Sequence, residues 1–150
     1  MDNKIFKKIF DVIAKKNGFE SAFGGWFKQS EECIFTIQLT RSNFGNYYMV
    51  EVKTYIQGAF GNRYFKDKSL LRDIGDIFRG EPKEFEAALN LEQQMEDEER
   101  TQKLESLFQN FIVPFSEKAL TKHGIYELAE KEEIYLLPAV KEELEKLKTI

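Results

Sequence analysis

The stretch "CIFTIQLTRSNFGNYYMVEV" (residues 33–52) has the alternating pattern of a β-hairpin, and it decides the fold. In its first half the odd-numbered positions are apolar, whereas in its second half the even-numbered positions are apolar. Because successive side chains of a strand point to opposite faces, odd positions of one strand must pair with even positions of the other. With a four-residue loop at 42–45, the residue numbers of each cross-strand pair add to 87, so Ile37 is expected opposite Val50.

This pairing gives the predicted sheet one apolar face and one mixed face. Ile37 lies on the apolar face, so Ile37→Asp is expected to unfold the protein, whereas Thr36→Asp on the mixed face is expected to be mild. The mixed face also carries Tyr47, Lys53 and Tyr55. Two alternatives follow for this face, because it is either open to a partner or covered by the C-terminal helices.

Two further elements precede this hairpin. Residues 3–16 have apolar side chains at helical spacing and a possible N-cap at Asp2 or Asn3, which predicts an amphipathic helix. The run "FESAFGGWFKQ" (residues 19–29) has two aromatic halves around a Gly-Gly pair. This arrangement predicts a second, tight hairpin.

The segment that follows the sheet pattern is harder to assign. Residues 58–68 are rich in turn-forming residues. Residues 69–79 place apolar side chains at helical spacing and predict a helix, although Gly75 in its middle is unfavourable. Residues 85–91 alternate between apolar and polar side chains, which predicts an edge strand with a charged outer side.

The remainder of the chain has helical patterns. A helix is expected from about residue 94, with a kink or an interruption at Pro114. Short helices are expected up to Lys122 and over 126–129, and "PAVKEELEKLK" (138–148) predicts the last helix. The expected fold is a single α+β domain over residues 1–150. Its antiparallel sheet of about four to six strands packs against an N-terminal helix and C-terminal helices.

The composition is that of a soluble globular domain. Hydrophobic residues make up 42% of the 150 residues and charged residues 32%, and no apolar stretch approaches the roughly 20 residues of a membrane-spanning helix. The amino terminus lacks the pattern of a signal peptide, and a single cysteine fits a reducing compartment. We therefore expect a cytoplasmic protein without a membrane partner.

The net charge of −4 hides an asymmetry between the two halves of the chain. Residues 1–75 contain 12 basic and 8 acidic side chains, whereas residues 76–150 contain 10 basic and 18 acidic ones. Phosphate contacts need clustered positive charge, so the overall acidity disfavours nucleic acid as a partner.

Four motifs carry a resemblance to a known family. They are "NGF" (17–19), "FGGWF" (23–27), "IQLTRSNFGNYYMVEV" (37–52) and "FIVPFSEK" (111–118). In this order they resemble the bacterial family catalogued as domain of unknown function 4304, over nearly the whole chain. The resemblance implies small soluble bacterial proteins with no established activity, cofactor or catalytic residue. It also admits a strand within residues 58–82.

Residues with catalytic or metal-binding potential are few. His123 is the only histidine, and its place near a predicted helix end favours a capping role. Cys33 lies on the apolar face of a strand and is expected to be a core residue. Paired carboxylates such as Asp73 and Asp76 fit a solvated helix face. No catalytic residue, cofactor site or metal site is therefore predicted.

The Gly58–Lys68 loop offers a weak nucleic-acid signal. Its "GAFG" motif (58–61) has the form of the four-residue loop with which KH domains hold a nucleic-acid backbone, and basic and aromatic residues follow it. The flanking helices of such a domain are not evident in the sequence. A nucleic-acid role for this loop is the weakest of the three functional readings.

The favoured reading is a non-enzymatic protein-binding module of the bacterial cytoplasm, either immunity-protein-like or an adaptor. The alternative is an enzyme that uses carboxylates, Arg41 and tyrosines. A deep polar pocket would favour the enzyme, and a shallow aromatic patch would favour the binding module. The expected partner-binding residues, which combine the mixed face with the turn that follows it, are Tyr47, Lys53, Tyr55, Arg63 and Tyr64.

Overall fold

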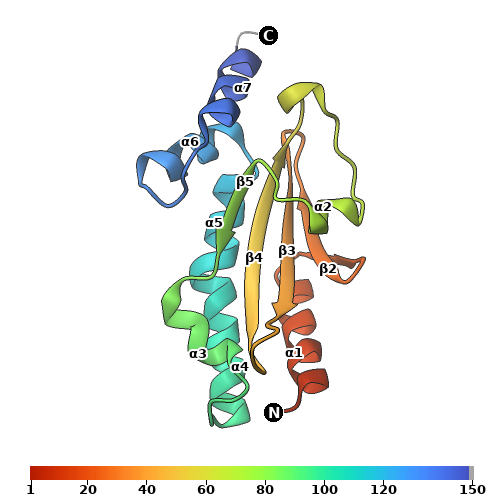
Figure 1. The fold of residues 1–150 in the computed structure, drawn as a ribbon, viewed down its shortest axis with the longest axis vertical. Coiled ribbons are helices and arrows are strands. Elements are labelled where there is room, and N and C mark those ends of the chain that lie inside the picture. The colour runs from red at the N-terminus through yellow and green to blue at the C-terminus, as the bar shows by residue number, and fades with distance from the viewer. Residues whose placement is uncertain (149–150) are drawn as a thin grey trace.

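A five-stranded antiparallel sheet in the order β1-β2-β3-β4-β5 forms the centre of the protein (Figure 1). The computed structural model describes residues 1–148. Each strand lies beside its neighbour in the sequence, so β1 and β5 are the two edges. The strands are β1 (Glu20–Ala22), β2 (Gly25–Gln29), β3 (Cys33–Arg41), β4 (Tyr48–Ile56) and β5 (Ile77–Gly80).

Helices precede and follow the sheet, and the predicted α+β class is confirmed. The N-terminal helix α1 and the long C-terminal segment α4–α5 pack along one face of the sheet, while α6 and α7 lie at one end (Figure 1). Within residues 1–148, no helix is both long and apolar enough to cross a membrane. The larger helices are α1 (Asn3–Lys16), α4 (Asp97–Leu107), α5 (Val113–Ala119), α6 (Lys122–Glu130) and α7 (Pro138–Lys148).

Local sequence explains the limits of α1. The Asp2 carboxylate accepts a hydrogen bond of 2.8 Å from the backbone N–H of Ile5, which satisfies one of the unpaired donors in the first turn. After the last turn, Gly18 takes a positive φ of 89°, a conformation that glycine adopts without steric cost. The predicted helix is therefore confirmed, with Asp2 rather than Asn3 as its cap.

The pairing of β3 with β4 confirms the two faces but corrects the register. Leu39 pairs with Val50, and Arg41 pairs with Tyr48, so the paired numbers sum to 89 rather than 87. The connecting loop is correspondingly longer, and it is closed by a bond from Ser42 N–H to the Tyr47 carbonyl at 2.9 Å. A shift by two residues keeps every side chain on its face, and burial alone does not distinguish the two registers.

Residues 69–91 differ most from the predictions. Only the first turn of the predicted 69–79 helix forms, as α2 (Ser69–Arg72). Gly75 then adopts a φ of 75°, and the chain turns into β5 beside β4. The predicted edge strand at 85–91 is also wrong, because these residues form a 3-10 turn (Lys83–Phe85) and α3 (Glu86–Leu89).

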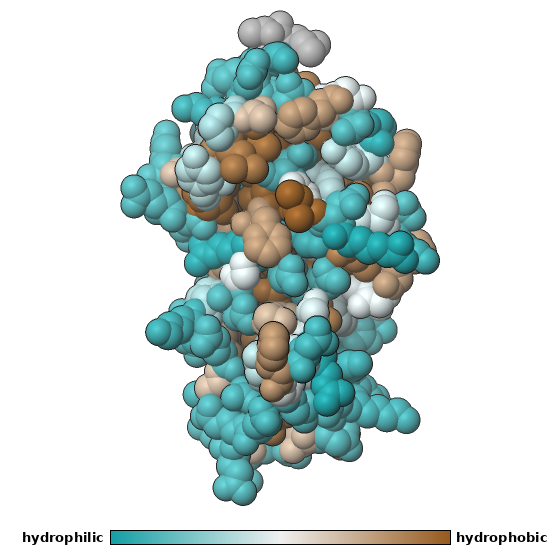
Figure 2. Space-filling model, viewed as in Figure 1, coloured by the Kyte–Doolittle hydropathy of each residue, from teal (hydrophilic) through white to brown (hydrophobic). Residues whose placement is uncertain are grey.

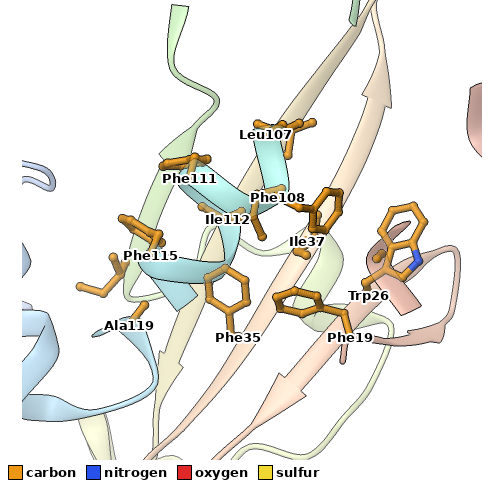
Figure 3. Packing of buried hydrophobic residues seen from close by; sticks show 14 of the residues in the cluster. Phe19, Trp26, Phe35, Ile37, Leu107, Phe108, Phe111, Ile112, Phe115 and Ala119 are labelled. Atoms are coloured by element: carbon orange, nitrogen blue, oxygen red, sulfur yellow. The ribbon is translucent and has the colours of Figure 1, made fainter. Parts of the chain in front are cut away.

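The main core lies between the sheet and the C-terminal helical segment. Figure 3 shows Phe108, Ile112 and Phe115 packed towards Phe35 and Ile37 of the sheet. Between α4 and α5 the helix widens into a π-helical turn, Phe108–Ile112, immediately before Pro114. The expected irregularity at this proline is present, but the backbone stays helical through it.

The mixed face of the sheet is covered over only part of its area. A second, smaller cluster places Leu70 and Leu71 of α2 on Phe27, Ile34 and Tyr55. The segment that follows β4, rather than the C-terminal helices, therefore covers this half. The 3-10 turn Ala59–Gly61 belongs to the same segment.

Candidate functional site

The structure buries the centre of the predicted partner-binding set. Only 3% of Tyr55 is exposed, and its hydroxyl donates to the backbone carbonyls of Leu70 at 2.7 Å and Asp73 at 3.2 Å. Lys53 is equally buried, and its Nζ donates to the Leu71 carbonyl at 2.8 Å. Burial raises the pKa of Tyr55 and lowers the pKa of Lys53. Both side chains hold the α2 segment on the sheet, and neither can serve as a surface anchor.

The other three predicted residues do not form one exposed patch. Tyr64 is half-buried, and its ring lies 5.0 Å from that of Tyr55. Arg63 is exposed beside it. Tyr47 is half-buried at the opposite end of β4, where it forms an isolated bridge with Asn90.

The glycine loop suggested for nucleic acid is packed against α7. A side chain added at Gly58 would come within 3.0 Å of Leu147. The backbone N–H of Phe60, which a phosphate would need, donates instead to the Glu143 carboxylate. A carboxylate at this place repels a nucleic-acid backbone.

The structure places Cys33 and His123, for which a core role and a capping role were expected. Cys33 is completely buried in the core, and burial raises the pKa of its thiol to about 12. His123 lies in the first turn of α6, where its Nε2 is 2.8 Å from Oε1 of Glu127. Thr121, and not His123, caps this helix. Within residues 1–148, no cluster of three or more His, Cys, Asp or Glu side chains could hold a metal ion.

The arginine proposed for an enzymatic site pairs with Tyr48 across the sheet, but no carboxylate is among the residues that line the depression beside it. Arg41 lines a depression of about 580 Å³ together with residues 42–46 of the β3–β4 loop. Phe44 in this loop is 93% exposed. The lining of this depression therefore lacks the acid and base groups that the enzymatic reading requires.

Two carboxylates extend the pairing of β5 with β4 beyond both ends of the strand. Asp76 accepts from the backbone N–H of Ile56 at 2.8 Å, and Glu81 accepts from that of Val50 at 3.4 Å. Burial raises the pKa of both carboxyl groups. The expectation of a solvated helix face is thus wrong for Asp76, which is half-buried and fixes the position of β5.

The most distinctive exposed feature surrounds the free edge of β5. Four large apolar side chains are exposed on β5, the turn before it and the linker that contacts it: Ile74 (73%), Phe78 (50%), Tyr135 (78%) and Leu137 (48%). The linker that carries the last two is joined to β5, since Nη1 of Arg79 donates to the Glu133 carbonyl at 2.8 Å. We call these four side chains and the free edge of β5 the edge surface.

Hydrophobic side chains gather in the upper half of the face shown in Figure 2, around β5 and the neighbouring C-terminal segment. A cleft of about 660 Å³ adjoins this area and is lined by Tyr126, Ile134, Tyr135 and Leu136 among others. Sequence reasoning missed the edge surface because it assigned residues 69–79 to a helix. The apolar stretch "EIYLLP" (133–138), which contains the exposed Tyr135 and Leu137, is the feature of the sequence that could have indicated this surface.

Comparison with known proteins gives a family match. The family model described as "Domain of unknown function (DUF4304)" matches residues 10–118, which is well over half of the 150 residues. No curated protein and no solved structure matches the chain significantly. The matched range contains the whole sheet and ends within α5. As its motifs predicted, the chain belongs to the DUF4304 family.

Proposed function

We propose that this chain is a non-enzymatic protein-binding module and that the edge surface is its binding surface. The observation that carries the proposal is the exposure of Phe78, Tyr135 and their apolar neighbours around an unpaired strand edge. Clustered exposed apolar side chains are typical of protein interfaces, and aromatic residues are frequent among those that contribute most of the binding energy.

The geometry of the other candidate residues supports this reading over the two alternatives. An enzymatic site is less well supported, because Cys33 is buried with a raised pKa. The hollow that brings tyrosines and carboxylates together, lined by Tyr47, Tyr48, Glu81 and Glu86 among others, does not include Arg41. A nucleic-acid site at Gly58–Lys68 is disfavoured because Glu143 accepts from the backbone of that loop.

The proposed setting is the bacterial cytoplasm, with a role as an immunity-like protein or an adaptor. The single cysteine and the family resemblance support this setting. The two roles predict different genetic neighbourhoods. A toxin gene immediately upstream would support the immunity role.

Site-specific photo-crosslinking tests the proposal. A benzophenone amino acid replaces Tyr135 in one variant and Val12 in the other, and both are expressed in the source organism. Val12 is a matched control, since it is an apolar residue of α1 that is 57% exposed away from the edge surface. We expect a discrete protein adduct from position 135 that position 12 does not give.

Substitution then measures the contribution of the surface. Phe78→Ala with Tyr135→Ala should weaken binding of the captured protein by roughly thirtyfold or more in calorimetry, because the loss of even one aromatic anchor costs about 2 kcal/mol. Ile5→Ala with Val12→Ala, which removes two exposed apolar side chains of α1, should change the affinity less than threefold. A folded Phe78/Tyr135 variant that retains full affinity would refute the proposed surface.

A further inference from the structure

We infer that the edge surface binds an extended, basic segment of a partner protein as a sixth strand beside β5. This inference rests on the proposed function, and it specifies the mode of binding and the chemistry of the partner. Strand addition to an open sheet edge is a general mode of peptide recognition, in which backbone hydrogen bonds supply affinity and alternate side chains supply specificity.

The backbone of β5 has the required free groups. Glu81 N–H donates to the Val50 carbonyl at 3.1 Å, which places the backbone groups of residues 77, 79 and 81 on the β4 side. The N–H and C=O groups of Phe78 and Gly80 therefore point away from β4. Within residues 1–148, these outward groups have no hydrogen-bond partner.

The strand is held firmly enough to act as a template. Asp76 and Glu81 bond to β4 just beyond the two ends of β5, and the Arg79 guanidinium lies 5.0 Å from the ring of Phe111. A preformed edge reduces the ordering cost of binding. Natural sheets protect exposed edges with charged residues or proline, and β5 has Asp76, Glu81 and Pro82 beside it, but the exposed apolar side chains of Ile74 and Phe78 accompany them.

Side chains on both sides of β5 would contact alternate residues of an added strand. Phe78 pairs with Lys53 and therefore lies on the mixed face. Arg79 lies on the core face, where it contacts the linker that carries Tyr135 and Leu137. An added strand therefore has apolar surface available on both of its faces, which favours a segment with apolar residues on both sides.

The charge around the edge surface favours a basic segment. Residues 72–84 and 130–137 carry seven carboxylates and four cations, a net charge of −3. The carboxylates are Asp73, Asp76, Glu81, Glu84, Glu130, Glu132 and Glu133, and the cations are Arg72, Arg79, Lys83 and Lys131. Pairing of two copies of the chain through β5 would bring two such acidic surfaces together, so like-charge repulsion disfavours a second copy as the occupant.

Gly80 allows a test that leaves the β4 pairing intact. Gly80→Pro removes the outward N–H, and proline is tolerated in edge strands where its nitrogen faces solvent. Gly80→Ala keeps this N–H, and its added Cβ meets only the Val50 carbonyl oxygen at 3.9 Å. Melting temperatures of both variants within a few degrees of that of the wild type would show that the fold is retained.

The probe is a displayed library of random 12-residue peptides, selected on the wild-type chain. We expect peptides with several apolar residues and an excess of Lys and Arg. Their affinity should fall at least tenfold for Gly80→Pro and less than threefold for Gly80→Ala. Should Gly80→Pro fail to fold, wild-type protein with the selected peptide provides the same test, through protection of the Phe78 and Gly80 amides from hydrogen exchange.

The two sets of variants distinguish failure of the strand-addition inference from failure of the proposed binding surface. Peptides that lose affinity for Phe78→Ala/Tyr135→Ala but not for Gly80→Pro would overturn strand addition and keep the binding surface. Peptides that are insensitive to both changes, or the absence of any enriched peptide, would count against both proposals. A dimer of the free chain that Gly80→Pro dissociates would identify a second copy, rather than a foreign strand, as the occupant.

Discussion

Ile37→Asp is expected to leave the protein unfolded at 25 °C. Ile37 is completely buried in the middle of β3, between Trp26 of β2 and Val52 of β4. The substitution replaces a packed apolar side chain with an unpaired charge, which costs several kcal/mol in addition to the lost packing. Because domains of this size have a total stability of about 5–15 kcal/mol, little or no folded protein should remain.

The control for this prediction lies on the other face of the same sheet. Met49 of β4 is 38% exposed, and Met49→Asp should cost about 1 kcal/mol or less. Thr36, which the sequence pattern suggested as the tolerant site, is completely buried under the α2 segment, so Thr36→Asp should be severe as well. Far-ultraviolet circular dichroism and urea titration measure these effects. Equal losses at Ile37 and Met49 would contradict the face assignment.

Arg100→Ala is expected to have the second largest effect, a loss of about 3–5 kcal/mol. Arg100 is 99% buried in α4, and its guanidinium donates to the carbonyls of Ala88 at 2.8 Å, Asn90 at 3.0 Å and Gln93 at 2.7 Å. These carbonyls belong to the end of α3 and to the turn that follows it. Truncation leaves them without a donor and leaves a cavity between α3 and α4.

Two variants of α4 serve as controls for the role of Arg100. Arg100→Lys keeps the charge but cannot donate to three carbonyls in the fork geometry of a guanidinium, so it should recover only part of the loss. Lys103→Ala on the exposed side of the same helix should change the stability by less than about 0.5 kcal/mol. Urea titration gives each free energy of unfolding. An Arg100→Ala protein within 1 kcal/mol of the wild type would disprove the structural role.

The elements that the sequence predicted well are those specified by local patterns. The helical spacing around Phe6 and Phe10 needs only one face of α1 to be buried, and the alternation in residues 33–52 assigns both faces of β3 and β4. The alternation does not specify the register of β3 against β4. Every register in which the two paired residue numbers add to an odd value puts the same side chains on each face. The bonds within the six-residue loop, such as that of Ser42 with Tyr47, select the observed register.

Residues 69–80 could not be assigned from their pattern. Apolar side chains at Leu70, Leu71, Ile74 and Ile77 fit a helix, but Ile77 is buried as part of a strand that pairs with distant β4. The same error hid the candidate site. The burial of Tyr55 and Lys53 under α2, and the open edge beside Phe78, both depend on where this segment packs in the tertiary structure.

Amide hydrogen exchange at Phe78 and Gly80 is the most direct test of an open, ligand-binding edge. In the free protein, these two amides should exchange faster than that of Arg79, whose N–H faces β4. After addition of a selected peptide or of the captured partner, both should slow at least tenfold. Protection at Phe78 and Gly80 equal to that at Arg79 in the free protein, or exchange that the ligand leaves unchanged, would contradict the account.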